Sequence, residues 1–584
     1  MSYIALGSKQ KIIVVGNGMV GHHFIDQLNK ANNNDFDITT FSDESRLAYN
    51  RVMLTSYFTG NSANNLALAT SQGYDDQDVE YFLNDEVIAI DREQKNINTA
   101  SGKTLSYDKL VLATGSFPFV PPVPGKEQDH IHVYRTLNDL EAIENSSKKS
   151  KVGVVIGGGL LGLEAANAIK ELGLETHVVE FAPRLMAVQL DQDGGDLLRE
   201  KIFALGVTVH TEKNTSEIIK GENCRYRMNF ADGSFLETDV IVFSAGIRPQ
   251  DALARQSGLV IGERGGIVID DHCLTSDKSI YAIGECALWD NKIFGLVAPG
   301  YTMAKVAVSH LTNTEPGKFT GADMSTKLKL LGVEVGSIGD AHGNTPHSQS
   351  YSFIDSVLGT YKKIVVSADG KMLLGAVLVG DTSDYSQWLP LVLNKIILTE
   401  PPEYLLIPKQ DSENSSNIAA LPDNAQVCAC YDVSKSVLSE AIKNGANDVA
   451  ALQSCTSAGT GCGGCIPLVT QVLESELEKI TANVSSNEII EEPFENILSE
   501  RADKNTYFIF PRIPGSNITP EHLIFIGEIA KKYNLHTQIS GAQRIDILGA
   551  RLEHLPMIKK RMADVGLETE HFLKDRLNKN SKEK

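Results

Sequence analysis

The feature that most constrains the fold is a glycine-rich turn placed between a strand and a helix. The apolar stretch KIIVV is typical of a buried parallel strand, and it runs directly into GNGMVG, which contains Gly16, Gly18 and Gly21. An amphipathic helix follows, and the strand after it ends beside Asp43. This order is the complete pattern of a dinucleotide-binding βαβ unit. Its glycines permit the turn and let a pyrophosphate approach the helix N-terminus, while the acid binds ribose hydroxyls.

The same pattern occurs a second time. The strand VGVVI precedes GGGLLG, which contains Gly157, Gly159 and Gly162, and a helix and a strand follow. That strand ends at Glu180, so two complete patterns predict two bound dinucleotides. A carboxylate at Glu180 favours NADH, because it accepts both ribose hydroxyls and repels a 2′-phosphate. Arg184 lies four residues further on and leaves NADPH open as the second ligand.

The charge and length of the chain limit the kinds of partner that it can bind. Its 584 residues correspond to about four domains, and 74 acidic against 54 basic residues give a formal charge of −20. Such a charge repels nucleic acid and anionic membranes, so we expect neither as a partner. We find no stretch of the roughly 18 apolar residues that a membrane span needs, and no signal-peptide pattern. We therefore expect the cytoplasm, where thiols stay reduced and the eight cysteines form no disulfide frame.

Three further segments accompany the two turns: LVLATGS at 110–116, VIVFSAGIRP at 240–249 and IYAIGE at 280–285. Together they resemble the pyridine-nucleotide disulfide reductase superfamily, over roughly residues 10–405. In that superfamily the first turn binds FAD and the second binds NAD(P)H. The resemblance implies cofactor contacts at these positions: Thr114, Gly115, Gly246, Gly284 and Glu285. The last of them is longer than the aspartate that is usual there.

The segment LAYNRVMLTSYF narrows the branch of that superfamily. Disulfide reductases carry a cysteine pair here, whereas this chain has no cysteine before Cys224, which excludes flavin-to-disulfide chemistry of that kind. The segment instead resembles ferredoxin and rubredoxin reductases, although Ser56 replaces a lysine that is common there. The resemblance implies that Arg51 lies near the flavin and Glu164 near the nicotinamide, as candidate catalytic residues. The alternative for each is an ordinary helix position.

Four cysteines form two close pairs, Cys428-x-Cys430 and Cys462-x-x-Cys465. Four thiolates in this arrangement provide a sulfur set for zinc or for an iron–sulfur cluster. The spacing resembles the small helical [2Fe–2S] domain of the bacterioferritin-associated ferredoxin family. We favour that cluster over a structural zinc ion, because a flavin module on the same chain needs an electron outlet. Of the other four cysteines, Cys224, Cys273 and Cys286 are isolated, which is typical of buried packing residues. Cys455 lies seven positions before Cys462 and stays open as an alternative ligand, although the pattern is complete without it.

The last part of the chain predicts a small α+β unit. We expect a strand at 507–510, a helix from Pro520 and a strand at 544–548. The unit resembles the ferredoxin-like half-domain of sirohaem-dependent nitrite and sulfite reductases. In that family basic residues, here Arg512 and Arg544, can line the anionic sirohaem and substrate. The alternative is that both arginines are surface charges on a docking domain.

From its N-terminus almost to its end the chain resembles the large subunits of NAD(P)H-dependent nitrite reductase. That family continues into a sirohaem and [4Fe–4S] domain with four more cysteines, but no cysteine follows Cys465 here. We therefore expect an NADH-dependent flavoprotein that passes electrons through FAD and a [2Fe–2S] cluster to a sirohaem acceptor on another chain, without reducing nitrite alone. An electron-transfer subunit of assimilatory nitrate reductase and a non-catalytic redox-binding protein stay open as alternatives. A homodimer also stays open.

The expected fold class is α/β, with two Rossmann-like dinucleotide-binding domains of the FAD/NAD reductase type. An α+β interface domain, a small helical [2Fe–2S] domain and the α+β half-domain follow. The predicted order is FAD-binding 1–148, NAD(P)H-binding 149–270, FAD-binding again 271–320, interface 321–408, linker 409–425, [2Fe–2S] 426–480, linker 481–504, half-domain 505–570 and polar tail 571–584.

Overall fold

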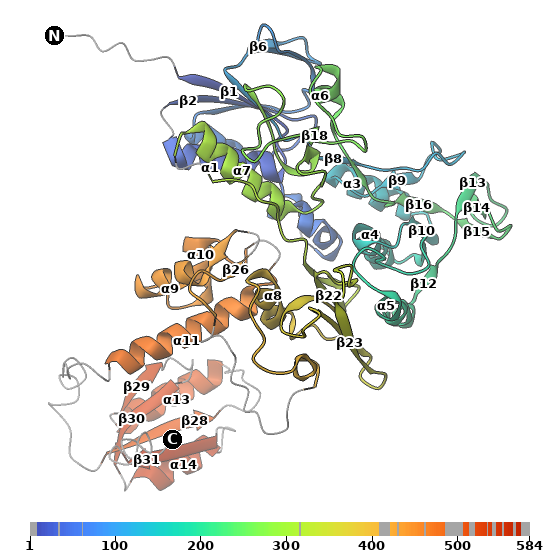
Figure 1. The fold of residues 1–584 in the computed structure, drawn as a ribbon. Helices are drawn as coiled ribbons and strands as arrows, with labels where there is room; N and C mark the ends of the chain where they lie inside the picture. Colours follow the sequence, from blue (N-terminus) through green and yellow to red (C-terminus); the bar gives the residue numbers. More distant parts are fainter. Residues whose placement is uncertain are drawn as a thin grey trace, which may run out of the picture. The chain divides into compact units, whose positions relative to one another are not determined.

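The computed structural model of the chain divides into two compact units, Met1–Lys479 and Ile480–Lys584. The first unit carries both glycine-rich turns and the small helical module, and the second carries the C-terminal α+β unit (Figure 1). The structure describes residues 9–32, 35–60, 62–314, 317–407, 421–428, 431–460, 463–484, 506–512, 520–533, 535–539, 545–551, 554–563 and 568–573.

The first glycine-rich turn follows the central strand of a five-stranded parallel sheet, whose order is β19-β7-β1-β2-β3. Strands β1 and β7 are apolar and almost fully buried, as expected for a parallel sheet covered on both faces. Helices α1 and α7 pack side by side here, although they are far apart in the sequence (Figure 1). We call this part the FAD lobe after its predicted ligand. Its elements are β1 (Gln10–Val15), α1 (Met19–Asn32), β2 (Phe36–Phe41), β3 (Val79–Phe82), β7 (Lys109–Leu112), β19 (Ile280–Ala282) and α7 (Val297–Leu311).

The second turn occupies the same place in a second parallel sheet, whose order is β12-β11-β10-β16-β9. Its central strand β10 ends directly before the turn, and α4 begins directly after Gly159. Helix α3 starts with a capping box between Thr136 and Asp139, which satisfies N–H groups of its first turn. We call this part the NAD lobe after its predicted ligand. Its elements are β9 (Ile131–Val133), α3 (Leu137–Ser147), β10 (Val152–Ile156), α4 (Leu160–Glu171), β11 (Glu175–Val179), α5 (Gln192–Ala204), β12 (Val207–His210) and β16 (Val240–Phe243).

Two short antiparallel strands, β8 and β17, connect the lobes, and two small antiparallel sheets, β4-β5-β6 and β13-β14-β15, extend them. Short helices and strands complete this region. They are η1 (Arg51–Thr59), η2 (Ala63–Leu66), α2 (Ser71–Asp76), β4 (Val87–Asp91), β5 (Asn96–Thr99), β6 (Thr104–Ser106), β8 (Ser116–Pro118), β13 (Thr215–Lys220), β14 (Tyr226–Phe230), β15 (Phe235–Thr238), β17 (Ile247–Pro249), α6 (Ala252–Gln256), β18 (Ile267–Val268), η3 (Gly284–Cys286) and β20 (Ala287–Leu288).

The interface domain is an antiparallel sheet with the order β21-β22-β25-β24-β23 and one helix, α8, packed on it. Trp388 of α8 is buried in a core that includes Ile338 and Leu378 of the sheet. The elements are β21 (Thr326–Leu330), β22 (Val333–Gly339), β23 (Gln349–Asp355), β24 (Thr360–Val366), β25 (Leu373–Val379), α8 (Tyr385–Leu393) and η4 (Pro402–Leu405).

The helical module buries one face of each of its main helices. Leu438 and Ile442 from α9 meet Leu468 and Val472 from α11 in a single core. Its elements are β26 (Gln426–Cys428), β27 (Val433–Ser434), α9 (Lys435–Lys443), α10 (Val449–Thr456) and α11 (Ile466–Val484). Helix α11 continues past residue 480, where the sequence predicts a linker.

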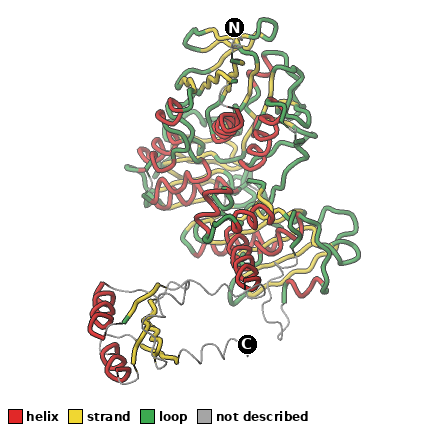
Figure 2. Tube along the Cα trace, turned by 90° about the vertical axis from the view of Figure 1, so that its left-hand side faces the viewer, coloured by secondary structure: helices red, strands yellow, loops and turns green. Residues whose placement is uncertain are grey.

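The second unit contains a four-stranded antiparallel sheet, ordered β29-β30-β28-β31, and the two helices among its described residues lie on one side of that sheet (Figure 2). Its elements are β28 (Thr506–Arg512), α13 (Pro520–Tyr533), β29 (His536–Ile539), β30 (Ile545–Arg551), α14 (Leu555–Ala563) and β31 (Glu568–Leu573). Strand β31 takes in the first three residues of the predicted polar tail, because they pair with β28. Within the described ranges, no helix is long and apolar enough to cross a membrane.

Candidate functional site

The first glycine turn is closed by backbone approaches that only glycine permits. A Cβ on Gly16 would overlap the Ala113 carbonyl oxygen, and a Cβ on Gly21 would overlap the Gly16 carbonyl oxygen. Gly16 also has a positive φ of 109°. A Cβ on Gly18, in contrast, would have nothing within 4 Å. The turn is therefore tight on its inner side and open where a pyrophosphate would approach, as a dinucleotide requires.

The second turn repeats this geometry at equivalent positions. A Cβ on Gly157 would overlap the Ser244 carbonyl oxygen, and a Cβ on Gly162 would overlap the Gly157 carbonyl oxygen. Gly159 has nothing within 4 Å of its Cβ position. Both turns therefore fit a dinucleotide by the same test.

The two acids that follow the turns differ in their surroundings. Glu180 lies against its own turn, because its carboxylate accepts hydrogen bonds from the Gly158 N–H at 2.5 Å and the Ala182 N–H at 2.6 Å. Asp43 is exposed after β2, while the neighbouring Glu44 side chain accepts from Tyr49. The ribose role of both acids stays a prediction, and Glu180 has the more defined position.

Asn17, inside the first turn, is a residue that the sequence analysis missed. It is buried, its Oδ1 accepts from the Ala48 N–H at 2.9 Å, and its Nδ2 donates to the Tyr74 hydroxyl at 3.0 Å. The available signal was a polar residue at a turn position where the second copy has Gly158. Asn17 ties the turn to the two loops that flank it.

A charged network surrounds Arg51, the predicted flavin neighbour. Its guanidinium pairs with Glu44 and donates to the Arg135 carbonyl at 3.2 Å. Glu285 accepts from the Arg135 guanidinium and from the Ser116 hydroxyl, each at 2.6 Å. Burial lowers the pKa of Arg51, but Tyr49, Glu44 and Glu285 outweigh it and raise that pKa above its ordinary value. The structure thus brings Arg51 and Glu285 together, and adds Arg135 as a residue with no sequence signal.

Thr114 and Gly115, two of the predicted cofactor contacts, lie where the lobes meet. The Thr114 hydroxyl donates to the Gln250 carbonyl at 2.6 Å, and the Gln250 N–H donates to the Gly115 carbonyl at 2.9 Å. Gly115 and Gly246 both have positive φ, of 69° and 102°. Strands β8 and β17 continue directly from this point.

Gly284 lies beside the first turn. Its φ is 79°, and a Cβ there would contact the Val20 side chain of α1 at 3.3 Å. A Cβ on Gly300 of α7 would come within 3.2 Å of the Gly284 Cα. The start of α7 therefore packs closely against the predicted FAD site.

Glu164 lies on α4, which packs against η1 of the FAD lobe. Burial raises the pKa of Glu164 to about 7, although a hydrogen bond with Thr55 lowers it. The Thr55 hydroxyl lies 3.1 Å from the Tyr134 hydroxyl. Burial therefore favours the protonated form of this carboxyl, and Glu164 lies where the two lobes contact each other. Its role beside the nicotinamide stays a prediction.

Two of the four predicted cluster ligands fall among the described residues. Cys428 ends β26, Cys465 precedes α11, and both are buried in the core of the helical module. Cys430 and Cys462 lie outside the described residues. In the ranges that the structure does describe, no group of three potential ligands gathers. The two buried thiols fit a thiolate site, and their partners stay a prediction.

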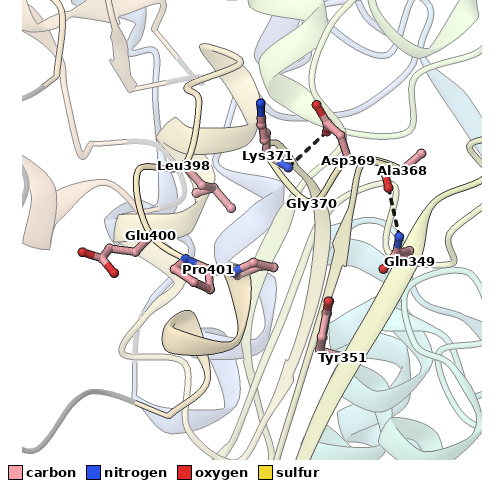
Figure 3. A pocket seen from close by; sticks show the side chains of 10 residues that line it. Gln349, Tyr351, Ala368, Asp369, Gly370, Lys371, Leu398, Glu400 and Pro401 are labelled. Carbon is pink, nitrogen blue, oxygen red and sulfur yellow. Dashed lines mark hydrogen bonds between the residues drawn. The ribbon is translucent and has the colours of Figure 1, made fainter.

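Arg544 lies outside the described residues, and of Arg512 only the backbone, at the end of β28, is described. A pocket on the interface domain (Figure 3) contains none of the predicted site residues. Two of its polar side chains are used in local turns, because Asp369 accepts from the Lys371 N–H and Gln349 donates to the Ala368 carbonyl.

Comparison with known proteins defines the class. Residues 10–310 match the family model of pyridine nucleotide-disulphide oxidoreductases, and residues 325–396 match the rubredoxin NAD+ reductase C-terminal domain. Residues 426–475 match the BFD-like [2Fe-2S] binding domain, and residues 499–565 match the nitrite/sulfite reductase ferredoxin-like half domain. A solved ferredoxin reductase from Rhodopseudomonas palustris is similar, with a TM-score of 0.62 and 25% identity, covering 68% of this chain and 97% of that one. Fold and site therefore define a two-dinucleotide flavoprotein reductase joined to a [2Fe–2S] module.

Two relatives narrow this class to a family. The nitrite reductase (NADH) large subunit of Escherichia coli (strain K12) is 48% identical over 97% of this chain and 74% of its own length. The assimilatory nitrate reductase electron transfer subunit of Bacillus subtilis (strain 168) is 30% identical over 96% of this chain and 79% of its own length. The chain belongs to the family of NADH-dependent nitrite reductase large subunits. The predicted family, the α/β fold class, the NAD(P)H-dependent oxidoreductase class and the cofactors FAD, NADH and [2Fe–2S] are confirmed.

Proposed function

We propose that this chain takes electrons from NADH and delivers them, through FAD and the [2Fe–2S] cluster, to a sirohaem acceptor on another chain of an assimilatory nitrite reductase. The observation that carries this proposal is a set of three sites in one compact unit: two glycine turns of equal geometry and a buried cysteine pair in a BFD-like module. A one-electron carrier beside a flavin indicates that electrons leave singly toward a further redox group. The thiolate ligands support the cytoplasm as the compartment.

The residues of the chain bind and orient the cofactors. When bound, FAD accepts hydride from NADH and releases single electrons, which the cluster carries onward. The open space beside Gly18 and Gly159 would let the backbone N–H groups of the two turns bind the two pyrophosphates. Glu164 and Arg51 lie at the meeting of the lobes, where they orient the two rings and exclude water.

NADH is the nucleotide that the second turn favours. Glu180 presents its carboxylate beside the turn, where it repels a 2′-phosphate. Arg184 is already engaged with its own loop, because its guanidinium donates to the Leu190 carbonyl at 2.9 Å and to the Ala187 carbonyl at 3.5 Å. This geometry supports NADH over NADPH.

Replacing one buried ligand tests the order of the carriers. Cys465→Ser should remove the [2Fe–2S] signal from the electron paramagnetic resonance spectrum of the reduced protein, while NADH still bleaches the flavin. Cys455→Ser is the matched control, because Cys455 is exposed and outside the predicted ligand set. A cluster signal of normal size in Cys465→Ser would contradict the ligand assignment. Loss of flavin bleaching would contradict a flavin that receives hydride independently of the cluster.

A second candidate acceptor is a nitrate reductase, since the chain spans 79% of the Bacillus subtilis electron transfer subunit. Mixing the protein with separate nitrite- and nitrate-reducing partners, and following NADH oxidation, distinguishes the two. We expect faster oxidation with the sirohaem-bearing partner. A homodimer stays open, and light scattering of the purified protein tests it.

A further inference from the structure

Helix α7 belongs to the FAD lobe and also packs against the [2Fe–2S] module. Near its start, Ala298 packs on the core of the module. Seven residues later, on the same helix face, Lys305 donates a 2.8 Å hydrogen bond to the Tyr431 carbonyl. Between them, Gly300 packs against Gly284 of the predicted FAD site. One short stretch of helix therefore contacts both redox sites.

Aromatic rings fill the space beside this stretch. The His23 ring of α1 stacks on Tyr301 of α7, with centroids 4.2 Å apart, and Tyr431 of the module lies 5.7 Å from Tyr301. The His23 Nε2 atom is buried and has no hydrogen-bond partner among the described residues. Burial lowers the pKa of His23 to about 4, with Lys305 as the next cause, so the ring is neutral at neutral pH. Lys305 therefore provides the positive charge at this contact.

Lys305 lies close to a predicted cluster ligand. Burial lowers its pKa, while Asp432 and the Cys428 thiol raise it, so both groups act on the ammonium. In the part of the chain that the structure describes, no carboxylate forms an ion pair with Lys305. Tyr431, whose carbonyl it binds, directly follows the predicted ligand Cys430. The ammonium therefore reaches the ligand-bearing segment from the FAD side.

We propose that Lys305 is a positioning residue for the electron transfer between the two cofactors: it fixes Tyr431 against α7 and raises the reduction potential of the [2Fe–2S] cluster. This inference rests on the proposed function. The cluster gains one electron, and no proton, when it is reduced, so a nearby fixed positive charge stabilises its reduced form. A unit charge roughly 10 Å away at an effective dielectric of about 20 changes that equilibrium about tenfold, which is about 59 mV for one electron.

The reduction potential of the cluster tests this directly. Lys305→Met keeps an unbranched side chain that is one atom shorter and removes its charge, whereas Lys305→Arg keeps the charge. Lys443→Met is the matched control, because Lys443 is exposed on α9 of the same module and the same unit charge is lost. The whole chain is titrated with reductant while the paramagnetic signal of the reduced cluster is followed. The equilibrium constant for reduction of the cluster should be about tenfold lower in Lys305→Met than in the unmodified protein. It should be nearly unchanged in Lys305→Arg and Lys443→Met.

The possible outcomes separate this inference from the proposed function. A Lys305→Met protein that holds its flavin and cluster and has the unmodified reduction potential would overturn the role of Lys305 alone. An equal drop in Lys443→Met would also overturn it, since position would then not matter. Absence of any reducible [2Fe–2S] signal in the unmodified chain would overturn both proposals.

Discussion

The two glycine turns have the same backbone conformation and differ in the contacts that hold them in place. In the first, the middle residue Asn17 is buried and bonded to Ala48 and Tyr74. In the second, the equivalent residue is Gly158, and its N–H is bonded to Glu180. The first turn is thus fixed by a side chain that reaches outward to neighbouring loops. The second is held by the acid that would bind the ligand, an arrangement that suits a nucleotide that enters and leaves.

The helices that follow the two turns also differ, at one equivalent position. The position two residues past the third glycine is His23 in α1 and Glu164 in α4. His23 packs on Tyr301 and Tyr431, toward the [2Fe–2S] module, while Glu164 faces Thr55 of the FAD lobe. Each helix therefore uses one position to contact the next module in the order of electron transfer. Burial disfavours the charged form of both side chains.

The largest effects should come from the third glycines. Gly21→Ala places a Cβ on the Gly16 carbonyl, so we expect a protein purified without FAD, measured by its absorbance. Gly162→Ala makes the same overlap in the second turn, so FAD should stay bound and NADH-dependent bleaching should slow roughly a hundredfold. Each variant is the control for the other. Equal loss of flavin in both would contradict the assignment of one nucleotide to each turn.

The next effect concerns the first turn alone. Asn17→Ala leaves the Tyr74 hydroxyl and the Ala48 N–H without this partner, at a cost of about 2 kcal/mol. FAD affinity should fall roughly thirtyfold, as followed by the fluorescence of released flavin. The KM for NADH should not change. A higher KM with normal FAD retention would show that Asn17 serves the other site.

The acids should show a smaller difference. Glu180→Gln removes the charge beside the second turn, so the preference of kcat/KM for NADH over NADPH should fall about tenfold. Asp43→Asn changes an exposed side chain, and FAD retention should change by less than about threefold. If Glu180→Gln kept its full preference, the selectivity would reside elsewhere in the second site.

The smallest effect is a pH dependence of stability. The Glu164 carboxyl has an ordinary pKa of 4.5 and a folded pKa of about 7. Between these values the folded chain binds more protons than the unfolded chain, so stability falls as pH rises from about 4.5 to about 7. The Glu164→Gln protein has no carboxyl at this position, so it should not lose this stability as the pH rises. Its Tm should equal that of the unmodified protein near pH 4.5 and exceed it by about 3 °C at pH 8. A constant Tm difference across this range would contradict the raised pKa.

The local sequence pattern predicted the two glycine turns. It did not predict hydrogen bonds between residues that are far apart in the sequence. The strand VGVVI is β10 residue for residue, and KIIVV lies within β1, because buried strands and glycine turns depend on neighbouring residues. The bonds Asn17–Tyr74, Arg135–Glu285 and Lys305–Tyr431 join residues 57, 150 and 126 positions apart. No spacing rule connects such pairs, so the networks around the predicted flavin site and the contact with the helical module came only from the structure.

The C-terminal unit shows the same limit on a smaller scale. The sequence predicts the helix from Pro520, and α13 begins at that residue, because proline favours the first helical position. The polar composition of residues 571–584 predicts a tail, yet β31 extends through Leu573. Pairing with a distant strand outweighs local composition there.

The central claim is that electrons from NADH reach the cluster through the flavin. Rapid mixing of oxidised protein with NADH without oxygen, with optical detection of flavin and freeze-quenched paramagnetic detection of the cluster, tests this order. The account predicts that flavin bleaching comes first and that the reduced [2Fe–2S] signal then grows to about one spin per chain. Cluster reduction before flavin bleaching, or complete bleaching with no cluster signal, would contradict it.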